Sequence, residues 1–306
     1  MDKKSIIGIA VVALLFLGFA FFSSKEQKEY QEQKALYDAY VDSVARASQP
    51  VTPLAAGADS LAAADAVLAD PADADSLAAA ARVRQVEMLG EALTAAREAE
   101  AEEFTVENDV IAVRFSTRGG QVKGVTLKDF TKYAPRGERS QLVELMDPST
   151  SRFGLSFYVK NGLRNIPVNT LDYVFEAQPV ETLGDGARQV VMRLPVAEGA
   201  ALEYRYLIYD TKTPQRDYLV DFDVCLVNMA HAMANQTQIQ IDWSNDTYQN
   251  ERGFQNENMY TTLAYRFPDE NSIEELGMSE KSKSKEVSSQ VNWVAFKQQF
   301  FSSVFI

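Results

Sequence analysis

Hydrophobic and polar positions divide the 306-residue chain into three parts with different patterns. Seventeen consecutive residues, Ile6 to Phe22, carry neither a charge nor a hydrogen-bonding side chain. Alanine and acidic residues then dominate, and no Phe, Tyr or Trp occurs between Val41 and Glu103. From Phe104 onward, aromatic and β-branched residues alternate with polar ones in short runs. We therefore predict a membrane anchor over residues 1–30, a spacer over residues 31–103 and a folded domain over residues 104–306.

The alternation in the third part has a period of two, which predicts half-buried strands. Turn signals such as Asn161-Gly162 and Asp185-Gly186 separate the runs. Helical patterns do not alternate with the strand patterns, which argues against a parallel α/β sheet. The sequence therefore predicts a mainly β fold, a large antiparallel β-sandwich. The predicted strand runs are Ile111–Phe115, Phe153–Val159, Leu202–Ile208, Tyr218–Leu226 and Ile239–Trp243.

The last fifteen residues, Asn292–Ile306, fit two structural templates. Three or four residues separate each apolar position from the next, as on one face of a helix, at Trp293, Phe296, Phe300 and Val304. Val294, Phe296 and Phe300 also fit one face of a strand. Periodicity alone leaves both alternatives open.

The apolar run near the N-terminus, with its flanking serines, is long enough to cross a hydrocarbon core of about 30 Å as a helix. A cleaved signal peptide is the alternative, with Gly18-Phe19-Ala20 as a cleavage site. The apolar run continues through that site into Phe21 and Phe22, which favours an uncleaved anchor. Lysines flank the run on both sides, so the positive-inside rule gives only a weak preference for a cytoplasmic N-terminus.

The second part has the composition of a flexible, partly helical spacer. Its residues from Ala35 to Glu103 include 23 alanines, 13 acidic side chains and 4 basic ones, too little apolar area for a compact core. Ser76–Glu103 contains no proline, so a solvated helix is plausible there. The alternative is a helix that binds a partner through one apolar stripe. That stripe would consist of Val83, Val86, Leu89 and Leu93.

Composition excludes several classes of chemistry. The net charge of −13 argues against a general electrostatic attraction to nucleic acids. One cysteine and one histidine exclude an intramolecular disulfide and any metal site that needs several such ligands. We therefore expect no cofactor and no enzymatic activity.

Individual residues give only weak catalytic signals. Asp221 and Asp223 carry the carboxylate oxygens that hard cations prefer as ligands, but they occupy the polar face of a predicted strand. Glu203 and Asp223 could form an acid/base pair, which spacing cannot establish. His231 lies in a turn-like stretch without a nucleophile motif. Cys225 lies within an apolar run and is expected to be a small buried side chain.

Two motifs resemble a known family. The segment Asp109–Phe130 closely resembles the opening of the large periplasmic domain of the YidC membrane protein insertase family, where two strands flank a T-R-G-G turn. Trp293–Phe301 resembles a segment near the end of the same domain, and the N-terminal anchor looks like the first transmembrane helix of the family. The motif residues are Thr117, Arg118, Gly119, Gly120, Trp293, Phe296, Gln298, Gln299 and Phe300.

The resemblance implies a protein of the bacterial inner membrane that inserts and helps to fold other membrane proteins, alone or with the Sec translocon and its accessory complex. It implies a cytoplasmic N-terminus, residues after about 25 in the periplasm, and a β-sandwich similar to sugar-binding and aldose-epimerase-like folds. The family's insertion groove lies in five further helices that this chain does not contain, so no insertion residue maps onto it. We also expect the sandwich to be incomplete at Ile306. A membrane-anchored carbohydrate-binding or epimerase-like protein is the alternative.

Overall fold

The computed structural model describes residues 71–210, 216–277 and 283–306. The predicted anchor, residues 1–30, and the predicted spacer up to residue 70 lie outside the described residues. Within the described ranges, no helix is both long and apolar enough to cross a membrane.

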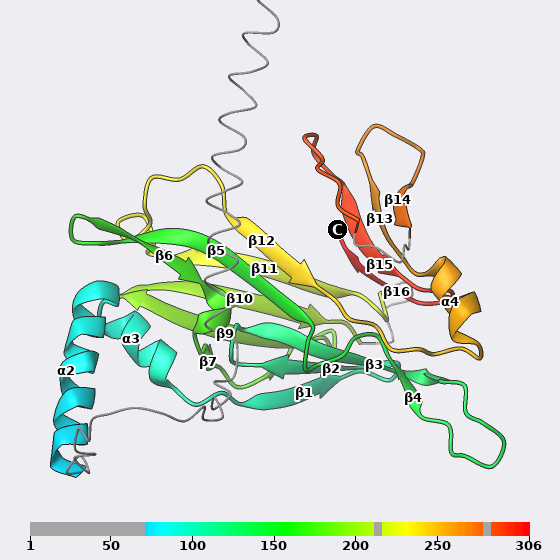
Figure 1. The fold of residues 1–306 in the computed structure, drawn as a ribbon, viewed down its shortest axis with the longest axis horizontal. Coiled ribbons are helices and arrows are strands. Elements are labelled where there is room, and N and C mark those ends of the chain that lie inside the picture. Colours follow the sequence, from blue (N-terminus) through cyan, green and yellow to red (C-terminus); the bar gives the residue numbers. More distant parts are fainter. Residues whose placement is uncertain (1–70, 211–215, 278–282) are drawn as a thin grey trace, which may run out of the picture. The chain divides into compact units, whose positions relative to one another are not determined.

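Strands in the described part of the chain form four antiparallel sheets (Figure 1). The first sheet has the strand order β1-β2-β3-β4, with β1 (Glu103–Glu107), β2 (Ile111–Ser116), β3 (Gln121–Thr131) and β4 (Leu142–Glu144). The second has the order β11-β10-β9-β7, with β8 also paired to β9. Its strands are β7 (Glu176–Ala177), β8 (Glu181–Thr182), β9 (Arg188–Ala197), β10 (Ala200–Ile208) and β11 (Val220–Val227).

The third sheet has the order β12-β5-β6, with β5 (Arg152–Asn161), β6 (Arg164–Asn169) and β12 (Gln240–Ser244). The fourth has the order β14-β13-β15-β16, and its strands are β13 (Thr262–Arg266), β14 (Glu274–Gly277), β15 (Trp293–Lys297) and β16 (Ser302–Phe305). A short 3₁₀ helix, η1 (Thr170–Asp172), follows β6, and α4 (Phe254–Tyr260) precedes β13. The predicted fold class, mainly β with antiparallel sheets, is confirmed.

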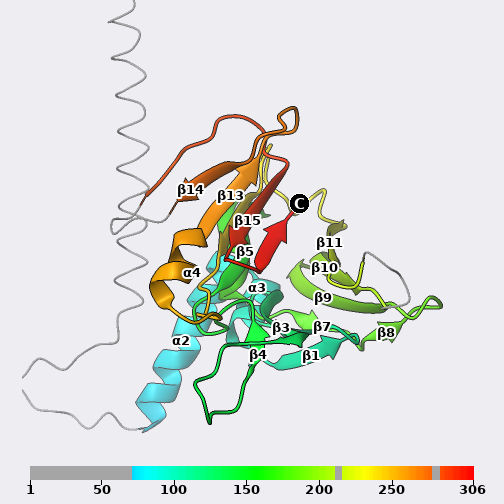
Figure 2. The ribbon, with the colours of Figure 1, turned by 90° about the vertical axis from the view of Figure 1, so that its right-hand side faces the viewer.

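The hydrophobic core lies between the first three sheets. Alternate residues of β2, β5, β9 and β10 point inward, as period-two patterning requires. Phe115, Phe157 and Tyr204 are each at most 3% exposed and belong to one core cluster. The fourth sheet adds no residue to that cluster, although Phe301 packs against it. Figures 1 and 2 show the fourth sheet at the side of the other three.

Two helices precede the first strand, α2 (Pro71–Leu89) and α3 (Glu91–Glu98). Gly90 separates them with a positive φ of 86°, a conformation that glycine adopts without strain. Leu93 on α3 is fully buried in the sandwich core, whereas Val83 on α2 is 59% exposed. The backbone N–H of Val174 donates to the carbonyl of Ala96 at 2.8 Å. Within the segment expected to be a spacer, α3 is thus packed against the sandwich.

Strand β11 differs from its predicted pattern. It begins at Val220 rather than Tyr218, and its apolar residues Val224 and Leu226 are 37% and 46% exposed. They lie on the core face, but β11 is an edge strand and the opposing strands do not cover its far end. Cys225, expected to be buried, is only half-buried, because it lies on the opposite face of this edge strand, with Asp221 and Asp223.

Candidate functional site

The T-R-G-G segment forms the turn between β2 and β3. The backbone N–H of Glu102 donates to Thr117 Oγ1 at 2.8 Å, and the N–H of Thr117 donates to the Glu102 carbonyl at 2.9 Å. Gly119 and Gly120 have φ values of 80° and 60°, so the turn needs residues that tolerate the left-handed region. The predicted strand–turn–strand arrangement is present.

Gly120 is enclosed by aromatic rings. A Cβ atom at this position would lie 2.9 Å from the ring of Phe175 and 3.0 Å from that of Tyr204. The hydroxyl of Tyr206 donates to the Gly120 carbonyl at 2.7 Å. The turn is therefore fixed against the second sheet by both packing and a buried hydrogen bond.

The same turn is bound to the segment that leads into β7. The N–H of Gly119 donates to the carbonyl of Tyr173 at 2.9 Å, and the N–H of Phe175 donates to that of Thr117 at 2.8 Å. Arg118 pairs with Val174 through its backbone, while its side chain is exposed and reaches the carbonyl of Asp172 at 3.4 Å. In this arrangement the T-R-G-G turn joins the first sheet to the second.

The second motif adopts the strand alternative that periodicity left open. Trp293 and Phe296 lie on β15, and the chain then turns into β16, so both halves pair in the fourth sheet. Phe296 contacts Trp243 of β12 edge-on, with ring centroids 4.6 Å apart. Phe300 lies in the turn and is 68% exposed. This hairpin brings the fourth sheet against the third.

Gln298 is buried and holds a neighbouring loop. Its Nε2 donates to the carbonyl of Tyr248 at 2.7 Å, and its Oε1 accepts a hydrogen bond from Asn250 Nδ2 at 3.1 Å. The carboxylate of Glu257, on α4, accepts the backbone N–H groups of Asn250 and Glu251. In contrast, the buried Oε1 of Gln299 has no hydrogen-bond partner among the described residues. The two adjacent glutamines therefore have different roles.

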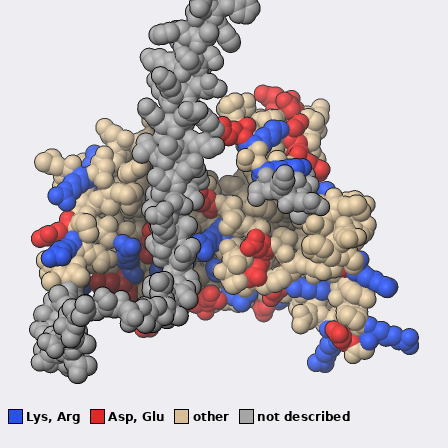
Figure 3. Space-filling view, in the orientation of Figure 1, with Lys and Arg blue, Asp and Glu red and all other residues tan. Residues whose placement is uncertain are grey.

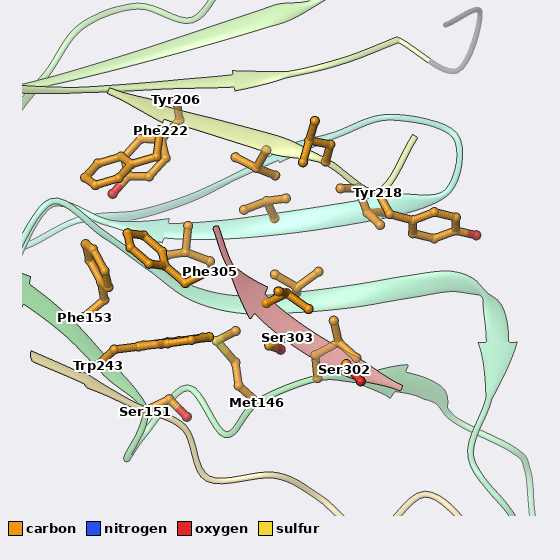
Figure 4. A pocket seen from close by; sticks show the side chains of 18 of the residues that line it. Met146, Ser151, Phe153, Tyr206, Tyr218, Phe222, Trp243, Ser302, Ser303 and Phe305 are labelled. Atoms are coloured by element: carbon orange, nitrogen blue, oxygen red, sulfur yellow. The ribbon is translucent and has the colours of Figure 1, made fainter. Parts of the chain in front are cut away.

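An apolar groove runs between β2, β3, β11 and β16. It consists of two adjoining cavities of about 240 and 530 Å³, both lined by Ile111, Val125 and Leu145. Figure 4 shows aromatic rings around the smaller cavity. Phe153 contacts Phe222 and Phe305 at centroid distances of 5.4 and 5.7 Å. A space of this size and lining accepts apolar side chains.

Two buried tyrosines lie on β10, and one of them, Tyr206, lines the smaller cavity. Burial raises the pKa of Tyr204 and of Tyr206 well above the ordinary value for tyrosine. Both hydroxyls therefore stay protonated, and both donate hydrogen bonds, Tyr204 to Thr170 Oγ1 at 3.3 Å. Their role in the structure is to satisfy buried acceptors.

The residues considered for catalysis do not converge on the groove. Glu203 is buried and bonded to Arg193 and Arg205, at 3.1 and 2.7 Å, which balances its charge. Asp223 is exposed, opposite Arg205 in the β10–β11 pairing. His231 is exposed and is not among the groove residues.

The surface shows mixed charge. Basic and acidic side chains are interspersed over the face in Figure 3.

Asp221 accepts a hydrogen bond from the hydroxyl of Tyr209. Within the described ranges, no three His, Cys, Asp or Glu residues are placed to hold a metal ion.

Sequence reasoning did not single out the residues that join the sheets. Gln121 links the T-R-G-G turn to β5, because its Oε1 accepts the backbone N–H of Phe153 at 2.9 Å. Its position after two glycines carries no signal for that contact. Phe153, Phe222 and Phe305 do occur in apolar runs, but the pattern cannot show that three distant strands bring them together.

Comparison with known proteins identifies the family. The sequence model of the family described as "YidC periplasmic domain" matches residues 103–306, more than half of the chain. The protein named "Membrane protein insertase YidC" from Bacteroides fragilis is 29% identical over the whole chain. Proteins of the same name from Parabacteroides distasonis and Cytophaga hutchinsonii are 28% and 25% identical over the whole chain.

The chain spans less than half the length of these relatives, 42% to 44%. The family match starts at the first residue of β1 and includes both motifs that hold the sheets together. This chain therefore belongs to the YidC periplasmic-domain family.

Proposed function

We propose that this chain is the anchor and periplasmic part of an inner-membrane insertase, which inserts and helps to fold other membrane proteins. The observation that carries the proposal is the similarity over the full chain to proteins named as membrane protein insertases. The apolar run from Ile6 to Phe22 supports the anchored arrangement, since its length matches a single span.

In this proposal the N-terminus is cytoplasmic, and the sandwich and the residues before it, from about residue 25, lie in the periplasm. The partners are nascent inner-membrane proteins, the lipid bilayer, and the Sec translocon with its accessory complex. Insertion makes and breaks no covalent bond, so the sandwich needs no catalytic group. Its contribution is a rigid body whose four sheets are joined through the two motifs, around Gly120 and Gln298.

The alternative, a carbohydrate-binding or epimerase-like protein, receives little support from the site. Epimerase-like chemistry would need a histidine together with a carboxylate, and His231 is exposed outside the groove. We therefore retain the insertase as the proposed function.

A depletion experiment tests the proposal. The complete protein that contains this chain is expressed in bacteria whose own insertase is depleted, and insertion of a single-span substrate is measured by protease accessibility. We expect insertion and growth to recover, and crosslinking to detect the Sec components. The proposal is contradicted if the protein is expressed but neither insertion nor growth recovers. A version lacking the apolar run Ile6–Phe22 is the matched control for anchoring.

A further inference from the structure

Three segments that are far apart in the sequence meet at one edge of the molecule, around the larger cavity of the groove. They are the end of β3 with the loop into β4 (residues 128–141), the loop that leads into α4 (residues 248–254) and the β15–β16 turn (residues 298–301). Each segment lines that cavity, through Phe130, Glu251 and Phe300 respectively. Figures 1 and 2 show the β3–β4 hairpin and α4 on the same side of the molecule.

Direct contacts hold the three segments together. The backbone N–H of Tyr133 donates to the carbonyl of Asn250 at 2.7 Å. The side chain of Asn250 in turn donates to Oε1 of the buried Gln298 at 3.1 Å. The ring of Phe301 meets that of Phe130 edge-on, with centroids 5.4 Å apart. The second family motif therefore fixes the structure of this edge.

Large aromatic side chains at this edge face solvent. Four of them are 42% to 68% exposed, namely Phe130, Tyr133, Phe254 and Phe300. Scattered exposed rings are ordinary on a protein surface, but these four lie on segments that touch one another. A group of exposed rings on adjoining segments indicates a contact surface.

Basic side chains accompany these rings. Residues 128–141 and 248–254 together contain five basic side chains and three acidic ones (Asp129, Glu138 and Glu251), a net charge of +2 in a chain whose net charge is −13. Arg136 and Arg139 are exposed, and neither forms an ion pair within the described part of the chain. Figure 3 shows basic side chains gathered at the end of the β3–β4 hairpin.

Two further cations lie against aromatic rings where the hairpin meets the loop. The ammonium of Lys132 is 4.2 Å from the centroid of the Tyr248 ring, and the guanidinium of Arg252 is 5.9 Å from that of Tyr133. Rings and cations are thus held side by side. The headgroup region of a bilayer favours this combination, because amphipathic rings lie at the level of the headgroups and cations pair with lipid phosphates.

We propose that the aromatic–basic surface formed by residues 128–141, 248–254 and 298–301 docks on a bilayer that contains anionic phospholipids. The rest of the chain is acidic, so an anionic membrane attracts this edge and repels the remainder, which orients the sandwich. The inference rests on the anchored arrangement of the proposed function, which keeps the sandwich close to the membrane. It adds the surface through which the sandwich contacts the lipid.

The test places a fluorophore in the β3–β4 loop of the full chain. Ser140→Cys, at an exposed position, is labelled in a Cys225→Ser background. The chain is reconstituted in protein-free vesicles of phosphatidylcholine with or without phosphatidylglycerol, and nitroxide-labelled headgroups quench a fluorophore that touches the bilayer. We expect strong quenching only with phosphatidylglycerol. Leu163→Cys, in the β5–β6 hairpin that Figure 1 shows on the opposite side, is the matched control and should stay unquenched.

Charge variants test the electrostatic part. Each basic residue near an anionic surface strengthens adsorption about fivefold, so the double variant Arg136→Gln/Arg139→Gln should lower the ratio of docked to undocked loops about 25-fold. Lys160→Gln/Arg164→Gln removes the same charge from exposed positions of the β5–β6 hairpin and should leave the quenching unchanged. Added salt should reduce the quenching, because it screens the attraction.

Equal quenching with and without phosphatidylglycerol, or an equal loss in the two double variants, overturns the proposal. So does protection of position 140 in native inner-membrane vesicles but not in protein-free ones, since that result indicates a protein partner. Flotation distinguishes the two proposals. A chain that does not float with the vesicles contradicts the anchored arrangement and this inference with it, whereas a chain that floats without quenching at position 140 overturns this inference alone.

Discussion

The hydroxyl of Tyr206, on the central strand β10, donates a 2.7 Å hydrogen bond to the carbonyl of Gly120 in the β2–β3 turn. The two residues are 86 positions apart, and the tyrosine is 4% exposed. One buried bond therefore connects the turn of the first sheet to the middle of the second. It accounts for a hydroxyl at a position where packing alone would accept phenylalanine.

Tyr206→Phe should destabilise the chain by about 1–2 kcal/mol, because it leaves the buried Gly120 carbonyl without this donor. Urea unfolding of the full chain in nonionic detergent measures the change. Tyr158→Phe is the matched control, since Tyr158 is 51% exposed and should change the stability by less than about 0.5 kcal/mol. Equal stability of the two variants would show that the Tyr206 bond contributes nothing.

Gly120→Ala and Gly162→Ala separate backbone strain from crowding. The two glycines have nearly the same φ, 60° and 61°, but a Cβ at Gly162 meets no atom within 4 Å. Gly162→Ala should cost about 1 kcal/mol, the penalty of the left-handed region. Gly120→Ala should cost about 3 kcal/mol, because overpacking against Phe175 and Tyr204 adds to that penalty. Similar unfolding midpoints would rule out a contribution from crowding.

Leu93→Ala tests whether α3 belongs to the folded domain. Removing a fully buried leucine side chain should lower the free energy of unfolding by about 3 kcal/mol. The exposed Val83→Ala on α2 should change it by less than about 0.5 kcal/mol. If the Leu93 variant is as stable as the wild type, α3 is not a part of the core in solution.

The adjacent glutamines of the second motif should respond differently to substitution. Gln298→Ala removes hydrogen bonds to Tyr248 and Asn250, so amide exchange in residues 248–251 should accelerate, with a loss of about 2 kcal/mol. Gln299→Ala removes a side chain whose Oε1 has no hydrogen-bond partner in the part of the chain that the structure describes, and it should leave that loop protected. Hydrogen exchange followed by mass spectrometry makes the comparison, and equal exchange rates would refute it.

The proposed topology has its own test. Alkaline phosphatase fused after Val41 should be active, because that enzyme folds only after export, whereas β-galactosidase fused at the same place should be inactive. The reverse pattern would place residue 41 in the cytoplasm and contradict the proposed orientation. A fusion after Lys4, before the apolar run, is the control.

Local pattern predicted much of the fold. The alternating runs around Val113, Phe157 and Tyr204 became strands β2, β5 and β10 because residues two apart in a strand share a face, whatever lies opposite. The same rule placed Val224 and Leu226 on the core face correctly. The rule could not predict that these two side chains are exposed, because exposure depends on whether another strand covers that end of β11.

Less of the candidate site than of the fold could be predicted from the sequence. The T-R-G-G turn was expected from its glycines, but the enclosure of Gly120 by Phe175, Tyr204 and Tyr206 depends on contacts between distant segments. The β-bulge in β3, where the register with β2 shifts between Arg114 and Phe115, likewise depends on how the two strands pair. Sequence spacing gives no sign of that shift.

The sequence by itself determined the fold class, the apolar run near the N-terminus and the family motifs, because these depend on residue type and on short-range spacing. Only the tertiary structure decided that α3 is packed on the sandwich through Leu93, that Asn292–Ile306 contains strands β15 and β16, and that Gln298 rather than Gln299 holds a loop. The physical reason is common to all three. Each depends on burial against residues far away in the chain, and that contact overrides local preference.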